Sequence, residues 1–190
     1  MNEPILEPVL RRMRMRRVLP YIREHQDCRL LDIGCGWEAR FLKSVAPFIA
    51  EGVGIDSKAP LLTEGKIRTE RLTLTDSLPY ADASFDIVTM LAVLEHFDHP
   101  EQLLCEIRRV LCPKGHLVLT VPSKAAKPVL EFLSFRLGIV SRNEISDHKA
   151  YYDHRSLAVL LSATGFTLQL HSYFQLGMNN FCVAQKLPAV

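Results

Sequence analysis

LLDIGCGWEARFLK, residues 30–43, is the stretch that decides the fold. An apolar run ends at Asp32, two glycines follow, and residues 39–48 have the pattern of a helix. Glycines at a strand-to-helix turn let the backbone approach a ligand closely, and the helix directs its free N–H groups toward the same place. The stretch therefore predicts a strand, a ligand-binding turn and a helix.

Apolar runs that alternate with amphipathic segments surround this stretch. Strands that are apolar throughout and alternate with helices are typical of a parallel sheet covered on both faces. No helix fits between the last two strand-like runs, so we expect them to pair as an antiparallel hairpin. The sequence predicts an α/β fold, a Rossmann-like three-layer sandwich with a mostly parallel seven-stranded sheet and a C-terminal antiparallel hairpin. The expected strands are residues 29–35, 52–57, 71–76, 85–91, 116–122, 167–175 and 180–187, and the main helices are 39–48, 99–111 and 156–166.

The length of 190 residues suits one domain. We expect a single domain over 1–190 in which Pro20 kinks or divides an N-terminal helix over residues 4–25. Insertions after the carboxyl ends of strands are where α/β folds build ligand pockets, so the long connection after the fifth strand should face the substrate. The expected parts are an N-terminal helical lid (1–27), a cofactor-binding core (28–122), a substrate-side insertion (123–153), and the last helix with the hairpin (154–190).

Composition excludes several classes of protein. The formal net charge of +2 is close to neutral and does not indicate a general affinity for nucleic acid. Five cysteines form no CxxC pair and have no histidine at a metal-ligand spacing, so we expect no metal and reduced, mostly buried thiols in the cytoplasm. No apolar stretch approaches the ~20 residues of a membrane span, and no signal-peptide pattern is present.

The acids around the glycines narrow the choice of ligand. The pattern of Gly34, Gly36 and Ala39 by itself suits a dinucleotide or an ordinary tight turn. Asp56 ends the second strand about twenty residues later, where a carboxylate can accept hydrogen bonds from ribose hydroxyls. Asp32, at the carboxyl end of the first strand, would repel a diphosphate and attract a positive amino group. The turn therefore favours a nucleoside ligand that carries an ammonium group and no phosphate.

With these residues the chain resembles the class I S-adenosylmethionine-dependent methyltransferases, particularly the small-molecule group that includes ubiquinone and menaquinone biosynthesis enzymes. LLDIGCG resembles the first motif of the family and GVGIDS the second. Residues 76–123, from DSLPY to LTVPS, are similar to its later motifs almost throughout. The resemblance covers about residues 28–122, extends more loosely to 187, and implies S-adenosyl-L-methionine as the cofactor.

The resemblance also implies where the cofactor lies. The backbone of the glycine turn should hold the methionine part, and Asp32 should hold its amino group. Asp56 should take the ribose hydroxyls, the segment after the third strand should lie by the adenine, and the end of the fourth strand should flank the methionine. The expected cofactor-binding residues are Asp32, Gly34, Cys35, Gly36, Asp56, Ser57, Asp76, Ser77, Leu78, Leu91 and Ala92.

Two departures from the family pattern keep other functions open. Trp37 and Glu38 stand where a third glycine is common, and Leu74 stands where the adenine-contacting acid is usual. Asp76 is displaced from that position by two residues, which keeps the same face of a strand. We expect Glu38 to face solvent or an arginine such as Arg40, unless it caps the next helix, and Trp37 to pack under the N-terminal helix. The alternatives are a catalytically degenerate cofactor-binding relative and, less favoured, a nicotinamide-dependent oxidoreductase.

Catalytic candidates follow the fourth strand and precede the last helix. His96 should lie near the transferred methyl group, where an imidazole can act as a base toward an oxygen acceptor; the alternative is a brace for the next helix. His148 and Tyr151 lie in a segment where the family often places substrate-facing side chains, although Asp153 and Ser156 suit a helix start. The expected catalytic candidates are therefore His96, His148 and Tyr151.

The acceptor is expected to be a small molecule or an amphiphile, such as a lipid-linked intermediate. The insertion is rich in Leu, Phe and Val, and the N-terminal helix carries arginines along one side. That basic side is either a solvated face or a surface for peripheral contact with an anionic membrane. No Asn-Pro-Pro-Tyr or Asp-Pro-Pro-Tyr sequence follows the fourth strand, which argues against methylation of DNA bases or glutamine.

Overall fold

The computed structural model describes residues 7–74, 77–135 and 147–188, with the side chains of residues 7 and 131–135 not described. The strands are β1 Arg29–Ile33, β2 Glu51–Asp56, β3 Thr63–Glu64, β4 Ile67–Arg71, β5 Phe85–Leu91, β6 Leu111–Pro122, β7 Phe166–Phe174 and β8 Asn179–Lys186. The α-helices are α1 Glu7–Glu24, α2 Arg40–Val45, α3 Pro100–Val110, α4 Ala126–Phe135 and α6 His154–Ala163, and short 3-10 helices cover η1 Ala46–Phe48 and η2 Leu94–His96.

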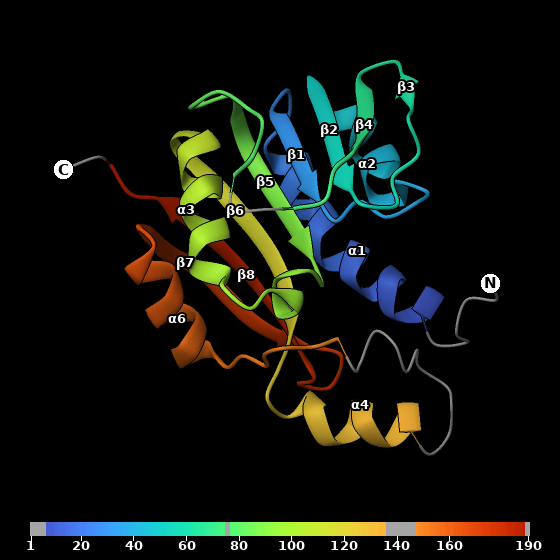
Figure 1. Cartoon of the computed structure of the whole chain (residues 1–190), viewed down its shortest axis with the longest axis vertical. Helices are drawn as coiled ribbons and strands as arrows, with labels where there is room; N and C mark the ends of the chain where they lie inside the picture. Colours follow the sequence, from blue (N-terminus) through green and yellow to red (C-terminus); the bar gives the residue numbers. More distant parts are fainter. Residues whose placement is uncertain (1–6, 75–76, 136–146, 189–190) are drawn as a thin grey trace.

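One twisted sheet of eight described strands forms the centre of the molecule, in the order β3-β4-β2-β1-β5-β6-β8-β7 (Figure 1). Strands β4, β2, β1, β5 and β6 run parallel. The hairpin of β7 and β8 returns antiparallel, with β8 beside β6. The expected α/β sandwich with its C-terminal hairpin is confirmed. The eighth strand is β3, a two-residue strand that pairs antiparallel with β4 and that the sequence did not indicate.

The third parallel strand lies earlier in the chain than expected. Strand β4 covers Ile67–Arg71 and pairs with β2, whereas the prediction over residues 71–76 was wrong. Only Ile67 and Thr69 of this strand are buried, because the strand lies near the edge of the sheet. The apolar alternation of Leu72 and Leu74 reflects contact with the core beyond the end of the strand.

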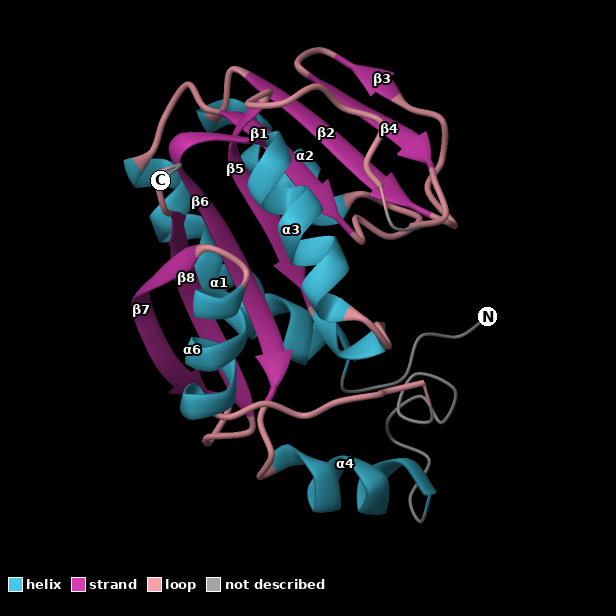
Figure 2. Ribbon diagram, turned by 60° about the vertical axis from the view of Figure 1, so that its left-hand side comes forward, coloured by secondary structure: helices cyan, strands magenta, loops and turns pink. Residues whose placement is uncertain are grey.

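Helices cover both faces of the sheet (Figure 2). Helices α1 and α2 pack on one face, with Val18 and Ile22 of α1 fully buried against Leu30 of β1. Helices α3 and α6 pack on the other face, where Leu31 and Ile33 point because successive strand residues alternate between the two faces. The two hydrophobic cores therefore lie above and below the same strands.

Helix α1 continues through Pro20 and is not divided there. A proline inside a helix costs one backbone hydrogen bond, but the buried side chains of Val18 and Ile22 hold the segments on both sides of it. The turn between β7 and β8 also ties α1 to the sheet. Gln175, in that turn, donates a hydrogen bond from Nε2 to the carbonyl of Leu10 at 3.0 Å. Among the described residues no helix has the length and apolar character needed to cross a membrane.

The last helix begins at a capping box. Ser156 donates its backbone N–H to Asp153 Oδ1 at 2.8 Å, and Asp153 donates its N–H to Ser156 Oγ at 2.9 Å. The helix-start function considered for these two residues is thus confirmed, and α6 begins at His154 rather than at 156. His99 is the residue that precedes α3, as expected. Helix α4, within the insertion, lies beyond the carboxyl ends of the parallel strands (Figures 1 and 2).

Candidate active site

The glycine turn after β1 is hydrogen-bonded to the end of the neighbouring strand β2. The N–H groups of Gly34 and Cys35 donate to the carbonyl of Ile55 at 2.8 and 3.2 Å. Gly34 has a φ of 78°, and a Cβ there would lie 2.3 Å from Cγ2 of Val93. Glycine is therefore required at this position by both conformation and space, because the chain that leaves β5 passes directly over it.

Asp56 holds the same turn from the neighbouring strand. Its Oδ2 accepts a hydrogen bond from the N–H of Gly36 at 3.1 Å, and its Oδ1 accepts one from the N–H of Lys58 at 2.7 Å. A carboxylate has about four acceptor positions, so two remain for ribose hydroxyls. Ser57, the next residue, is exposed beside it.

Asp32 is the buried acid of the site, with 2% of its surface exposed. The hydroxyl of Thr89, on β5, donates to Asp32 Oδ1 at 2.7 Å. Burial raises the pKa of Asp32 to about 7; the Asp56 charge adds to this rise and the Thr89 hydrogen bond opposes it. A buried carboxylate of this kind is stabilised in its ionised form when a cation, such as an ammonium group, binds beside it.

The two unusual residues of the turn lie at its rim. Glu38 forms an ion pair with Arg40, which confirms the expected partner. Trp37 is 69% exposed, so the expectation that it packs under the N-terminal helix was wrong. Helix α2 begins only at Arg40, after Ala39 in a left-handed conformation, and no side chain caps it. Glu38 therefore does not act as a helix cap, because the extra residue of the turn displaces it from the helix start.

The segment expected by the adenine is described in part. Asp76 lies outside the described residues. Ser77 is exposed, and Leu78 is 3% exposed in the core, with its N–H donating to Glu106 Oε2 of α3 at 2.9 Å. Leu74 is half-buried against the same core. Contact of Ser77 or Leu78 with adenine stays a prediction.

The chain leaves β5 in a tight turn. Leu91, half-buried, ends the strand, and Ala92 follows with a φ of 61° and an N–H that donates to Thr120 O at 2.9 Å. Val93 then covers Gly34, and η2 begins at Leu94. The expected methionine-side residues therefore lie beside the glycine turn.

The structure brings the three catalytic candidates together. The ring centroids of His96 and His148 are 5.0 Å apart, and Nδ1 of His148 lies 3.2 Å from the hydroxyl of Tyr151. Burial lowers the pKa of His148 to about 4, and the neighbouring His96 adds to this effect. Nδ1 of His96 lies 3.4 Å from Oδ2 of Asp147.

Glu95 is a candidate that the sequence interpretation missed. Its side chain is fully buried, and neither carboxylate oxygen has a hydrogen-bond partner among the described residues. Burial raises its pKa to about 8, against the opposing effects of its own backbone N–H and, less strongly, of the Arg14 charge on α1. Its backbone carbonyl accepts the N–H of Lys149 at 2.7 Å, which ties the His148 segment to η2. The sequence feature that could have identified Glu95 is an acidic residue directly after the apolar residues that follow the fourth strand.

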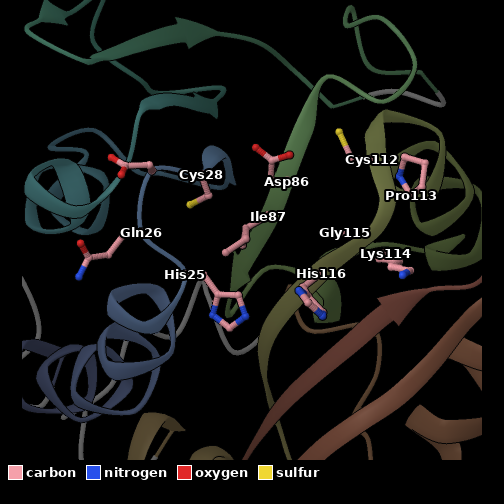
Figure 3. A pocket seen from close by; sticks show the side chains of 11 residues that line it. His25, Gln26, Cys28, Asp86, Ile87, Cys112, Pro113, Lys114, Gly115 and His116 are labelled. Atoms are coloured by element: carbon pink, nitrogen blue, oxygen red, sulfur yellow. The ribbon is translucent and has the colours of Figure 1, made fainter.

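A separate pocket of about 330 Å³ lies elsewhere (Figure 3). Figure 3 shows His25, Cys28, Asp86 and His116 around it, from the segment before β1 and the first parts of β5 and β6. These are the amino ends of parallel strands, whereas ligands of open α/β sheets bind outside the carboxyl ends. The pocket is therefore distinct from the glycine turn.

Comparison with known proteins gives a family. A methyltransferase-domain model matches residues 9–171. A demethylmenaquinone methyltransferase of Thermus thermophilus is 31% identical over 182 residues, which cover 81% of each chain. One from Thermotoga maritima is 36% identical over 110 residues, covering 55% of this chain and 48% of that protein. The chain spans about half the length, or less, of several curated relatives that it matches.

A solved structure shares the fold. The 1,6-didemethyltoxoflavin-N1-methyltransferase of Burkholderia thailandensis, solved with bound S-adenosylhomocysteine, has a TM-score of 0.68 at 18% identity. The similarity covers 92% of this chain and 79% of that one. The family model that matches most of the chain and the glycine turn with its two strand-end acids indicate the same class of enzyme. The chain therefore belongs to the methyltransferase-domain family of class I S-adenosylmethionine-dependent methyltransferases.

Proposed function

We propose that this protein transfers the methyl group of S-adenosylmethionine to an oxygen atom of a small, amphiphilic acceptor. The observation that carries the proposal is the pair of carboxylates on either side of the glycine turn. Asp32 is buried with the Thr89 hydroxyl as a hydrogen-bond donor, and Asp56 anchors Gly36 with acceptor positions to spare. An ammonium group and a ribose diol complement these two acids.

The reaction needs alignment more than acid-base chemistry. The acceptor oxygen attacks the methyl carbon in line, a C–O bond forms, and the C–S bond breaks with its electron pair remaining on sulfur. The proton of the acceptor hydroxyl leaves to a nearby base or to solvent. His96, His148 and Tyr151, gathered after β5, are the groups proposed to receive the acceptor and assist loss of that proton.

An amphiphilic acceptor is supported by the elements around the site. Helix α4 carries Val129 and Leu130 next to residues 131–135, which include two phenylalanines, and lies beyond the strand ends (Figure 1). The matched relatives from Thermus and Thermotoga are named as demethylmenaquinone methyltransferases. We further propose that α1 forms a lid whose exposed arginines, Arg12, Arg16 and Arg17, face solvent or an anionic membrane surface. A cytoplasmic location is supported by five cysteines that are all free thiols.

Calorimetry with S-adenosylhomocysteine and, separately, with NAD tests the cofactor. We expect binding of the first alone, and binding of NAD alone would instead favour the oxidoreductase alternative. A screen that measures release of S-adenosylhomocysteine with quinol, phenol and lipid-linked acceptors then tests transfer. Cofactor binding without turnover on any hydroxyl acceptor, but with an amine or carbon acceptor, would contradict the choice of oxygen.

A further inference from the structure

Three side chains that are capable of binding a metal meet after β5. Glu95 and His96 come from η2, and His148 comes from the segment before α6. One ligand atom from each residue can be chosen so that all of them lie within 4.8 Å of one another. The group arises from two distant parts of the chain, which the hydrogen bond between Lys149 N–H and Glu95 O holds together.

The carboxylate of Glu95 gives an independent sign of a missing ligand. It is fully buried, and among the described residues neither of its oxygens meets a hydrogen-bond donor. Buried carboxylates are ordinarily paired or bound to a metal, because a polar group without a partner loses its hydration and gains nothing in return. The other buried acid among the described residues, Asp32, follows that rule, because the Thr89 hydroxyl donates to it.

Both histidines are oriented as metal ligands usually are. A ligating imidazole generally gives its second nitrogen to a carboxylate, a carbonyl or another polar group, which fixes the ring. Nδ1 of His148 lies 3.2 Å from the Tyr151 hydroxyl, and Nδ1 of His96 lies 3.4 Å from the Asp147 carboxylate. With Nδ1 engaged in these contacts, Nε2 of each ring is the nitrogen left to act as the metal ligand in the proposed site.

We propose that Glu95, His96 and His148 bind one divalent transition-metal ion. Two imidazoles and one carboxylate suit Zn²⁺, Mn²⁺ or Fe²⁺, whereas Mg²⁺ and Ca²⁺ prefer oxygen ligands throughout. In a tetrahedral site with bonds of ~2.0–2.1 Å, ligand atoms lie roughly 3.3 Å apart, so the cluster contracts on binding. Rotation of the His96 ring, whose side chain is 28% exposed, allows that contraction.

Three protein ligands leave a coordination position open, as in catalytic metal sites. Glu95 follows Val93, which covers Gly34, by two residues, so the proposed metal would be held close to the cofactor turn. On the basis of the proposed function, we assign the fourth coordination position of the metal to the hydroxyl group of the acceptor. Coordination lowers the pKa of the hydroxyl, its proton passes to solvent, and the resulting oxygen attacks the methyl carbon as the C–S bond breaks.

Direct metal binding tests the site without reference to activity. Full-length protein, freed of metal by a chelator and dialysis, is titrated with Zn²⁺ and Mn²⁺ by calorimetry and with Co²⁺ by visible absorption. We expect one equivalent to bind. Glu95→Gln and His148→Ala should each weaken binding at least ~10-fold, whereas His99→Ala, in an exposed histidine of the same loop, should not change it.

Circular dichroism and melting curves show that each variant is folded before it is titrated. Metal affinity that is the same in wild type, Glu95→Gln and His148→Ala would overturn the site, as would no binding of any of the three ions. His148→Ala removes a ligand from the loop side, so it keeps the test valid if the buried Glu95→Gln variant fails to fold.

Cofactor binding separates this inference from the proposed function. If S-adenosylhomocysteine binds normally while no metal does, the metal site is wrong and the methyltransferase proposal stands. If transfer to the acceptor stops after metal removal and returns with one equivalent of metal, the acceptor role is supported. Transfer at an unchanged rate by protein shown to be metal-free would overturn that role, whatever the affinity of the site.

Discussion

The carboxylate of Asp56 accepts a hydrogen bond from the backbone N–H of Gly36, with Oδ2 and N 3.1 Å apart. The acid expected to hold the ribose thus also fixes the glycine turn expected to hold the methionine. A second bond, from the N–H of Lys58 to Oδ1 at 2.7 Å, fixes the orientation of the carboxylate. One side chain at the end of β2 therefore connects the two halves of the proposed cofactor site.

Replacement of Asp56 should affect both stability and cofactor affinity. Asp56→Ala removes two backbone hydrogen bonds to a charged acceptor, so we expect a loss of about 1–3 kcal/mol in the free energy of unfolding. We expect at least a ~10-fold loss of affinity for S-adenosylhomocysteine, because the ribose bonds are lost as well. Urea denaturation and calorimetry measure the two effects. Asp56→Asn, which keeps one acceptor oxygen, is the control, and unchanged cofactor affinity in the alanine variant would refute the ribose assignment.

Gly34 should tolerate substitution less well than Gly177. Both glycines have a positive φ, 78° and 84°, so alanine costs each roughly 1–2 kcal/mol in backbone strain. A Cβ at Gly177 meets nothing within 4 Å, whereas one at Gly34 would lie 2.3 Å from Val93. We expect Gly34→Ala to melt at a lower temperature than Gly177→Ala and to lose cofactor affinity. Equal melting temperatures would show that Val93 moves aside without cost.

Asp32 should make cofactor binding depend on pH. Its folded-state pKa of about 7 lies above the unfolded value, so the folded protein binds more protons between those two values. The stability of the protein should therefore fall as pH rises through this window to about 7, and then level off. Because the ionised carboxylate attracts the ammonium group, affinity for S-adenosylhomocysteine should rise between pH 6 and pH 8.

Asp32→Asn should remove both effects. An amide oxygen can still accept the hydrogen bond from Thr89, but no charge is buried. We expect this variant to be more stable than wild type at pH 8, to bind the cofactor more weakly, and to lose the pH dependence. A wild-type affinity that stays flat from pH 6 to pH 8 would mean that Asp32 does not change its charge on binding.

The unusual glutamate of the turn should be dispensable. Glu38 pairs with Arg40 at the surface, and an exposed ion pair contributes ~1 kcal/mol or less. We expect Glu38→Gly to bind S-adenosylhomocysteine as well as wild type or slightly better. Trp37→Ala, in a side chain that is 69% exposed, should behave in the same way. A large loss of affinity in either variant, by calorimetry, would place that side chain against the cofactor.

His96 should matter for transfer and not for folding. Its ring contacts Asp147 and His148, and the start of α3 is at His99, so the fold does not depend on it as a helix cap. We expect His96→Gln to keep its melting temperature and cofactor affinity while the transfer rate falls ~100-fold. A variant that melts early but turns over normally per folded molecule would instead support the helix-brace alternative.

The amino-acid sequence by itself determined the layered fold and the cofactor turn. Apolar strands that alternate with helices bury both faces of a sheet, and this pattern is local enough to read along the chain. The two glycines, Asp32 and Asp56 likewise lie at or just after the ends of strands, and such positions can be recognised from a short stretch of sequence. The third strand was misplaced because Ile67–Arg71 lies near the sheet edge, where only alternate residues are buried and charges are tolerated.

Only the tertiary structure decided which side chains meet. Trp37 was expected to pack under the N-terminal helix, but its position at the rim of the turn before α2 leaves it exposed. The sequence analysis did not single out Glu95, yet packing between η2 and the segment before α6 buries it beside His96 and His148. Contacts between distant segments depend on how helices and loops close over the sheet, and no local periodicity encodes that closure.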